Sequence, residues 1–491
     1  MKFILPRIRD ILFLSILVGT LLLAPRMLNI DSDLGRHLAL GQYMLDAREI
    51  PLTDILSHTK SGEPRPPYEW LSQILFALAY RALSLDGVIL LTALVIAIAW
   101  ALIYKEAARR SGLPVTALLI TILAAAASSV HWLPRPHVFT FPFLAIWVER
   151  LDRLRSGEKI PLWHFPLLML FWANLHGGFV FGVLAWLAFI AGWVIDRWQR
   201  QESATTEIAK NFLLIGGLSI LASFVTPSGW GNWRGVLGNS STYILSRTVE
   251  TMSPDFYQTQ FWPFLILLAL CLIVPSLSGV RLPVAHAFLL AGFAVLSLMM
   301  ARNIPLFTVV AAPILASSAR HLLDSVKLWV EVESRLLEIE RTLRGLAWPI
   351  AGSFVIVILL VLQFSRTHQS LARFDARVFP VAAVDWLKEN PPQGKMYNEF
   401  NWGGYLLFRL WPEQKVFIDS QTDFYGEELV SEYDIILSAY ADLEAKLTQY
   451  DVDWVIVRNN SAVAVKLSRA ENWRLVYVDD VAVILKQVKH P

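Results

Sequence analysis

The sequence predicts an all-α polytopic membrane domain followed by a small soluble α/β domain. The 491 residues are 55% hydrophobic and only 17% charged, whereas about 25% of the residues in a soluble globular domain are charged. Apolar runs recur through residues 1–363, several of them close to the ~20 residues that a helix needs to cross a bilayer. After residue 363 the composition becomes polar, and short β-rich runs alternate with helical patterns, which is typical of an α/β domain.

Eleven apolar segments are predicted to be transmembrane helices. They cover residues 9–27, 88–105, 113–131, 137–150, 160–175, 178–195, 211–226, 261–277, 284–300, 303–318 and 345–363. Lys and Arg are concentrated in every second connection, and the positive-inside rule assigns those connections to the cytoplasm. The alternation predicts a multi-pass protein of the inner (cell) membrane, with a cytoplasmic N-terminus and an extracytoplasmic C-terminal domain.

This topology gives a membrane domain at residues 1–363 and an extracytoplasmic domain at 364–491. Two long outer loops are expected, at residues 28–87 and 227–260. Residues 70–85 are apolar as well, but counting them as a span would break the Lys/Arg alternation. We therefore expect them to form an amphipathic helix at the outer membrane surface.

The C-terminal domain contains recognisable local patterns. KVFIDS, DWVIVR, RLVYVDD and VAVILK are predicted to be strands, because β-branched and aromatic residues dominate them. PVAAVDWLKEN and SAYADLEAKLTQY are predicted to be helical. The single cysteine, Cys271, lies within an apolar run, so a disulfide framework and a thiolate metal site are both excluded.

Polar side chains gather at the predicted outer ends of the spans. Ionisable groups near membrane depth are costly, so each one is a functional candidate. One outward-facing cavity is expected to be lined by His37, Glu69, His131, His137, Asn174, His176, Glu250, Asp255 and Asn303. Taken singly, such residues are usually interfacial groups or helix caps. Carboxylates, imidazoles and guanidiniums on the same face of the membrane together indicate a site.

Asp31 and Asp33 follow the first span and are two residues apart on extended chain. A helix is expected from Leu34 to about Ala47, and Asp33 would be its N-cap. Capping and chemistry are both compatible roles for this carboxylate. The two carboxylates can also reach one cation, so Asp31 and Asp33 are the candidate ligands for a divalent ion (Mg²⁺ or Mn²⁺), although no metal site is firmly indicated.

Several segments resemble the GT-C superfamily of polytopic glycosyltransferases, which use polyprenyl-phosphate-linked sugars. The resemblance rests on DSD at the start of the first outer loop, on GQYMLDAREIPLTD, on PPYEWL and on a basic cytoplasmic turn, all within about the first 110 residues. NEFNWGGYLLFRLWPEQKVFIDSQTDFYG also resembles the tail domain of a bacterial subgroup of that superfamily. Over the remaining spans the similarity is one of architecture.

The resemblance implies that a sugar is transferred from a polyprenyl-phosphate donor to a hydroxyl of an extracytoplasmic glycan, lipid or protein acceptor. The general base would be Asp33 or Asp31, by position in the first outer loop. Arg135 and Arg302 are the outward-facing candidates for binding the donor phosphate, because guanidinium groups bind phosphate bidentately. Several relatives have adjacent Asp and Glu where this chain has Asp-Ser-Asp, which leaves the identity of the base and any metal role open.

Two other function classes remain open. A transporter or flippase of a lipid-linked or polar solute also needs a polar cavity, but no inverted repeat is visible and the inner half of the spans carries few charges. A non-catalytic GT-C-like assembly subunit would keep the same carboxylates. Membrane lipids are expected partners, and the net charge of +2 gives no indication of nucleic-acid binding.

Overall fold

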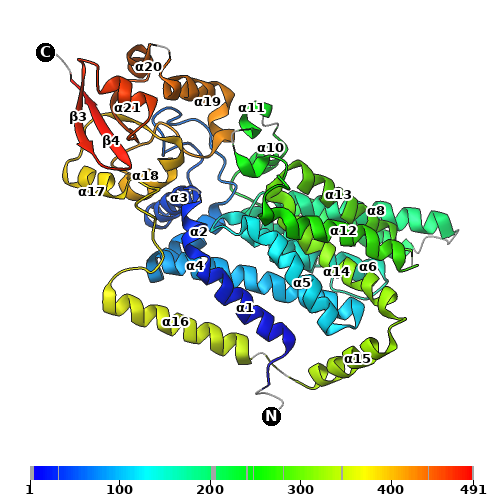
Figure 1. Ribbon diagram of the computed structural model, residues 1–491. Coiled ribbons are helices and arrows are strands. Elements are labelled where there is room, and N and C mark those ends of the chain that lie inside the picture. Colours follow the sequence, from blue (N-terminus) through cyan, green and yellow to red (C-terminus); the bar gives the residue numbers. More distant parts are fainter. Residues whose placement is uncertain are drawn as a thin grey trace. The chain divides into compact units, whose positions relative to one another are not determined.

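The computed structural model describes residues 5–30, 32–200, 206–238, 241–246, 248–279, 281–343, 345, 347–440 and 442–488. The chain forms two compact units (Figure 1). Unit 1 comprises Met1–Leu22, Leu90–Val236 and Thr248–Gln369, and unit 2 comprises Leu23–Ile89, Leu237–Arg247 and Ser370–Pro491. The first long outer loop thus belongs to the same compact unit as the C-terminal residues, while the predicted domain boundary at residue 363 stays a prediction.

Unit 1 is helical in its described residues. Its helices are α1 (Ile8–Leu22), α5 (Pro114–Ser128), α6 (Thr140–Arg155), α7 (His164–Leu175), α8 (Phe179–Arg200), α9 (Thr206–Ser223), α12 (Trp262–Leu277), α13 (Val284–Met299), α14 (Ile304–Leu323), α15 (Lys327–Thr342) and α16 (Ala347–Thr367). The second predicted outer loop contains the short helices α10 (Trp230–Leu237) and α11 (Thr242–Leu245). α14 is buried along most of its length and packs against α5, α12 and α13.

Each of the eleven predicted spans coincides with a helix. Six helical segments of the described chain are long and apolar enough to cross a membrane: Trp70–Ser111, Pro114–His131, Phe179–Gln199, Thr259–Leu277, Ala301–Leu323 and Ala347–Thr367. α7 and α13 are shorter apolar helices. The chain is therefore a membrane protein. The count of eleven spans stays a prediction, because α1, α6 and α9 belong neither to the six long apolar segments nor to the two shorter apolar helices.

α4 (Trp70–Ser111) joins the predicted interfacial segment to the second predicted span. Its helical geometry is interrupted at Leu83 and Ser84, where Ser84 has a φ of 53°. A Cβ at Gly87 would lie 2.1 Å from the carbonyl oxygen of Ala79, so only glycine fits just after this break. The helix therefore changes direction where the sequence predicts an interfacial helix to end, and the position of the first part relative to the membrane stays a prediction.

Unit 2 contains a four-stranded sheet and its surrounding helices (Figure 1). The strands are β1 (Lys395–Asn398), β2 (Val452–Arg458), β3 (Trp473–Val478) and β4 (Ala482–Gln487), in the order β1-β2-β4-β3. β1 and β2 are parallel, and the other two pairings are antiparallel. The helices are α2 (Ala24–Asn29), α3 (Asp33–Ala47), α17 (Val381–Glu389), α18 (Gly403–Leu410), α19 (Thr422–Ser438), α20 (Leu443–Gln449) and α21 (Ala462–Leu467).

Two local predictions in unit 2 are wrong. KVFIDS is not a strand, because its amides are used elsewhere: Val416 N donates to Leu56 O at 3.1 Å, and Phe417 N donates to Asn398 Oδ1 at 2.8 Å. Asp33 is not an N-cap but the first helical residue of α3; Ser32 occupies the cap position, without a side-chain capping hydrogen bond. The Asp33 carboxylate is directed to other partners.

Candidate functional site

Two glycines bring the start of α3 into contact with the start of α18. A Cβ at Gly35 would lie 2.0 Å from Gly404 O, and a Cβ at Gly404 would lie 2.0 Å from Ser32 O. The neighbouring Gly403 is equally confined, because its Cβ would lie 2.4 Å from Ile418 O. Any side chain at these positions would collide with backbone. The glycines of the DSDLG and NWGG motifs therefore place residues 419–421 beside the first turn of α3.

Asp33 lies in this contact and is only 9% exposed. Its Oδ1 accepts a hydrogen bond from Ser420 Oγ and lies 3.6 Å from Arg36 Nη2. Arg36 Nε in turn lies 3.7 Å from Asp419 Oδ1. A carboxylate of the first outer loop is thus held by a hydroxyl from the C-terminal residues and by a guanidinium one helical turn away.

Arg65 forms the second half of this buried network. It donates to Asp54 Oδ1 and to Gln421 Oε1, both at 2.5 Å, and its Nη2 lies 3.4 Å from Asp419 Oδ2. Burial acts to lower the pKa of Arg65, but the carboxylates of Asp419 and Asp54 outweigh it and raise that pKa. Arg65 therefore stays charged. No local sequence pattern indicated that Arg65 and Asp419 belong to the site.

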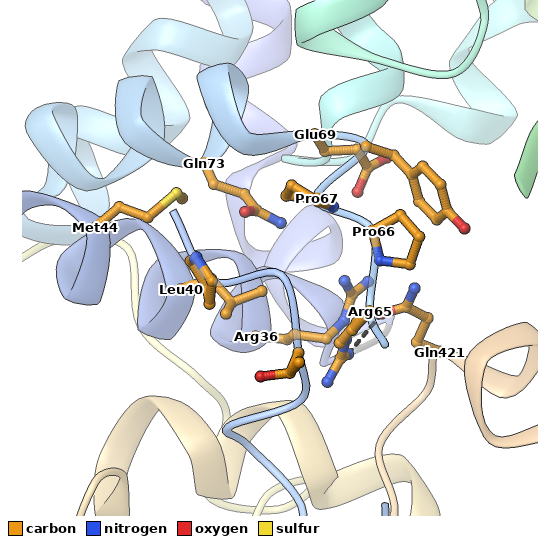
Figure 2. A pocket seen from close by; sticks show the side chains of 12 residues that line it. Arg36, Leu40, Met44, Arg65, Pro66, Pro67, Glu69, Gln73 and Gln421 are labelled. Atoms are coloured by element: carbon orange, nitrogen blue, oxygen red, sulfur yellow. Dashed lines mark hydrogen bonds between the residues drawn. The ribbon is translucent and has the colours of Figure 1, made fainter. Parts of the chain in front are cut away.

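A small cavity adjoins this network (Figure 2). Its volume is about 30 Å³, room for one or two water molecules. Arg36 and Arg65 line it with Glu69, Gln73 and Gln421. The remaining lining residues are Leu40, Met44, Pro51, Thr53, Pro66, Pro67 and Tyr68.

Arg36 lines this cavity and has one unsatisfied donor. It is 6% exposed, and its Nε has no hydrogen-bond partner in the part of the chain that the structure describes. The surroundings are nevertheless acidic. Two guanidiniums (Arg36 and Arg65) face four carboxylates, giving a formal balance of 2 − 4 = −2; the carboxylates belong to Asp33, Asp54, Glu69 and Asp419. This balance disfavours a phosphate and suits a neutral group, such as a hydroxyl, that can accept from Arg36.

His37 and Glu69, both predicted site residues, meet next to this cavity. His37 Nδ1 lies 3.7 Å from Glu69 Oε2 and 3.3 Å from Gln73 Nε2. The His37 ring is 2% exposed. The structure therefore brings three predicted residues of the first outer loop (Asp33, His37 and Glu69) into one region of unit 2. Asp31 lies outside the described residues.

Unit 1 contains a second group of predicted residues, at the ends of its helices. Arg135 Nη1 donates to both carboxylate oxygens of Glu250, at 3.1 Å each. His131 Nδ1 lies 3.7 Å from Glu250 Oε2. The rings of His131 and His137 are 4.3 Å apart, and those of His137 and His176 are 6.4 Å apart. We call these five residues, together with Arg302, the Arg135 cluster.

His176 links the cluster to Arg302. Its Nδ1 accepts from Gly178 N at 2.9 Å and contacts Thr140 Oγ1 at 2.9 Å. Because Trp172 Nε1 donates to that same hydroxyl oxygen, Thr140 can donate its proton to His176. Burial lowers the pKa of His176 to about 3, and the charge of Arg302 acts in the same direction. His176 is therefore neutral near pH 7, and Arg302 is close enough to act on it.

Three other predicted residues make contacts of a structural kind. The Asn174 amide donates to Leu170 O and Val225 O, and the Asn303 amide donates to Leu296 O. Asp255 is exposed, and its carboxylate accepts from Tyr257 N and Gln258 Nε2 within its own loop. Their part in a cavity stays a prediction. So does a cavity shared by the Asp33 network and the Arg135 cluster, which lie in different compact units.

Three or more converging metal ligands are not found among the described residues: no three of their His, Cys, Asp or Glu side chains form a ligand set. Mg²⁺ often takes only one or two protein carboxylates together with substrate phosphates. Because Asp31 lies outside the described chain, a divalent ion held by Asp31 and Asp33 stays a prediction, and no step of the reaction is assigned to a metal ion.

Solved structures of an archaeal enzyme share this fold. Oligosaccharyltransferase AglB from Archaeoglobus fulgidus, in complex with an inhibitory peptide and a dolichol-phosphate, matches 91% of this chain and 69% of its own, with a TM-score of 0.56 and 10% identity. The apo form of the Archaeoglobus fulgidus oligosaccharyltransferase has the same coverage, a TM-score of 0.57 and 11% identity. Its complex with Zn and sulfate covers 90% and 68%, with a TM-score of 0.52 and 10% identity.

No protein-family model and no curated protein sequence matches the chain. At 10–11% identity the structural similarity is one of fold. It extends over about nine-tenths of this chain. The predicted fold, a helical membrane domain with a small α/β part at the C-terminus, is therefore confirmed.

Proposed function

We propose that this protein is a membrane glycosyltransferase that moves a sugar from a polyprenyl-phosphate donor to a hydroxyl of an extracytoplasmic acceptor. The observation that carries the proposal is the position of Asp33. It is a nearly buried carboxylate that lies 3.6 Å from Arg36, and Arg36 lines a small cavity whose acidic surroundings suit a neutral ligand such as a hydroxyl. The archaeal neighbour with this fold is an oligosaccharyltransferase solved with a dolichol-phosphate, which supports a lipid-linked donor.

The chemistry requires one proton transfer and one exchange of bonds at the anomeric carbon. Asp33 takes the proton of the acceptor hydroxyl while the hydroxyl oxygen bonds to the anomeric carbon. The bond from that carbon to the phosphate oxygen breaks, and polyprenyl phosphate leaves with the bonding electron pair. A positioned general base contributes about 10²–10⁴-fold to such a step. Ser420 and the first turn of α3 hold the Asp33 carboxylate in place.

The leaving phosphate needs a cationic partner, and Arg135 and Arg302 are proposed for this role. The negative balance around Arg36 makes the Asp33 network a poor place for the phosphate. In the Arg135 cluster, the Arg135 guanidinium is paired with the Glu250 carboxylate. A phosphate bound there would replace Glu250 as the acceptor of the hydrogen bonds that Arg135 donates. The exposed side chain of Arg302 supplies a second guanidinium beside neutral His176.

The donor class distinguishes this proposal from its alternatives. Purified protein in detergent is incubated with glycan, lipid or protein acceptors and with either a radiolabelled polyprenyl-phosphate sugar or a nucleotide sugar, and released polyprenyl phosphate or nucleotide is measured. We expect release from the lipid-linked donor only. If the donor crosses the membrane of proteoliposomes while its sugar–phosphate bond stays intact, the protein would instead be a flippase. Stable association with a partner protein, with no turnover of any donor, would support an assembly subunit.

A further inference from the structure

A second and larger cavity lies among the helix ends of unit 1. Its volume is about 330 Å³, against the ~10–15 Å³ that one water molecule requires. The wall is formed by the ends of α4, α6, α12, α13 and α14 and by the segments that follow or precede them. The lining residues are Arg109, Arg110, Asp152, Arg155, Ser156, Glu158, Ser278, Arg281, Leu282, Pro283, His286, Ser317, Ser318 and His321. We call this space the basic cavity.

The basic cavity and the Arg135 cluster lie at opposite ends of the same helices. α6 begins at Thr140, which contacts His176 of the cluster, and ends at Arg155 in the cavity wall. α14 begins one residue after Asn303 and carries Ser318 in the cavity wall. At a rise of 1.5 Å per residue these lengths separate the two sites by about 20–25 Å. The Lys/Arg distribution predicts that the cavity faces the cytoplasm.

A buried ion network closes one side of the cavity. Asp152 lies 3.1 Å from Arg110 Nη2 and 2.9 Å from Arg155 Nη2, and His286 Nε2 lies 2.8 Å from its Oδ1. The side chains of Asp152 and Arg110 are 9% and 6% exposed. These groups neutralise each other and hold α4, α6 and α13 together. Their role is structural, and they leave no capacity on Asp152 for a cationic ligand.

Positive charge remains after these pairs are counted. The wall carries four arginines and two carboxylates, 4 − 2 = +2 with histidines neutral. Glu106, behind the wall, accepts from Arg109 at 2.7 Å and from Arg110 at 2.6 Å, which lowers the balance to +1. The remaining positive charge lies on Arg281, because in the described chain only the amide oxygen of Gln199, a neutral group, accepts a hydrogen bond from it. A network in which every charge is paired with an opposite charge would have neither this open volume nor an arginine without a carboxylate partner.

The chemistry of the wall fits a phosphate group. Guanidinium groups bind phosphate oxygens with charge-assisted hydrogen bonds, and Ser317 places a hydroxyl in the same wall. Leu282 and Pro283 add an apolar border. Because the cavity lies where membrane-crossing helices end, lipid headgroups occupy the same level. Basic pockets between transmembrane helices on the cytoplasmic side are typical binding sites of anionic lipid headgroups.

We propose that the basic cavity binds the phosphate group of an anionic membrane lipid, with Arg281 as its principal cation. The site is separate from the glycosyl-transfer chemistry and does not depend on it. A bound headgroup would join the ends of α12, α13 and α14 and so stabilise unit 1. Anionic phospholipid and soluble phosphate share this chemistry, and the experiment has to separate them.

Lipid retention by the purified full-length protein tests the proposal. Native mass spectrometry would compare retention of phosphatidylglycerol and phosphatidylcholine by the wild type, by Arg281→Gln and by the control Arg335→Gln. Arg335 is exposed on α15, does not line the cavity and undergoes the same change of charge. A second variant, Ser317→Phe, fills the cavity without changing its charge. Inorganic phosphate at millimolar concentration is the soluble competitor.

We expect the wild type and Arg335→Gln to retain one phosphatidylglycerol in preference to phosphatidylcholine. Arg281→Gln should weaken retention about fivefold, the effect of one basic residue near anionic headgroups, and Ser317→Phe should weaken it as well. Equal retention of both lipids by the wild type, or unchanged retention by Arg281→Gln, would overturn the proposal. Displacement of the lipid by inorganic phosphate, with phosphate stabilising only chains that keep Arg281, would overturn the lipid assignment in favour of a soluble ligand.

Discussion

The Asp33 network and the Arg135 cluster contain similar side chains but are built differently. Around Asp33, residues of the first outer loop meet residues 419–421 through glycine contacts, and every charged member is largely buried. The Arg135 cluster is assembled from turns at helix ends, and its Arg302 is exposed. The first arrangement depends on the folding of unit 2. We therefore expect substitutions there that remove a buried contact to change stability and activity together, and substitutions in the cluster to change activity alone.

The largest effect on stability is expected from Asp419→Ala. Asp419 is fully buried and accepts from Gln421 N and Tyr425 OH while facing Arg36 and Arg65. Removing one partner of a buried ionic network costs about 3–5 kcal/mol.

Denaturant unfolding of the purified protein measures the effect of Asp419→Ala, and the exposed Asp423→Ala is the control in the same segment. Transfer activity should fall with stability in the Asp419 variant. If Asp419→Ala unfolds at the same denaturant concentration as the wild type, the buried network does not stabilise unit 2. The Asp33 network would then not differ from the Arg135 cluster in its contribution to stability.

Gly404→Ala should have the next largest effect. The new Cβ would meet Ser32 O at 2.0 Å, and backbone cannot yield as a flexible side chain can. Overpacking of this kind costs about 1–3 kcal/mol, and here it would also separate α18 from the first turn of α3. Gly292→Ala is the control, because no atom lies within 4 Å of its added Cβ. Equal stability of the two variants would show that α3 and α18 do not pack this closely.

Arg135→Lys should weaken use of the donor without destabilising the protein. Lysine keeps the charge but cannot replace the planar, multi-donor guanidinium. We expect the KM for the lipid-linked donor to rise about tenfold, equivalent to about 1.4 kcal/mol, with the unfolding midpoint unchanged. Arg234→Lys, an exposed position of α10, is the matched control. A loss of stability without a change in KM would make Arg135 a structural partner of Glu250 only.

The smallest effect is expected from Asp255→Ala. The side chain is exposed and its hydrogen bonds stay within its own loop. Exposed substitutions of this kind usually change stability by less than about 0.5 kcal/mol. Transfer rates close to the wild type would exclude Asp255 from the predicted cavity. A large loss of transfer activity in Asp255→Ala would instead support the prediction that Asp255 lines the cavity.

The sequence was most informative where local patterns determine structure. Apolar segments marked helices at all eleven predicted positions, and the DSD motif after the first span pointed to Asp33, which lies in the buried network while its catalytic role stays a prediction. Arg65 and Asp419 could not be found in this way, because they are 354 residues apart in the chain. KVFIDS resembles a strand in composition, yet its amides bond Leu56 and Asn398 instead. The paired glycines of NWGG were the only local sign that backbone approaches closely there.

The rate of glycosyl transfer by Asp33→Asn tests the central claim most directly. Asparagine keeps the size of the side chain and an oxygen that accepts from Ser420, but it cannot take a proton from an acceptor hydroxyl. With a polyprenyl-phosphate sugar as donor, the rate should fall by about 10²–10⁴-fold, while the unfolding midpoint and donor affinity stay near those of the wild type. Transfer at the wild-type rate by a folded Asp33→Asn protein would contradict the assignment of Asp33 as the general base.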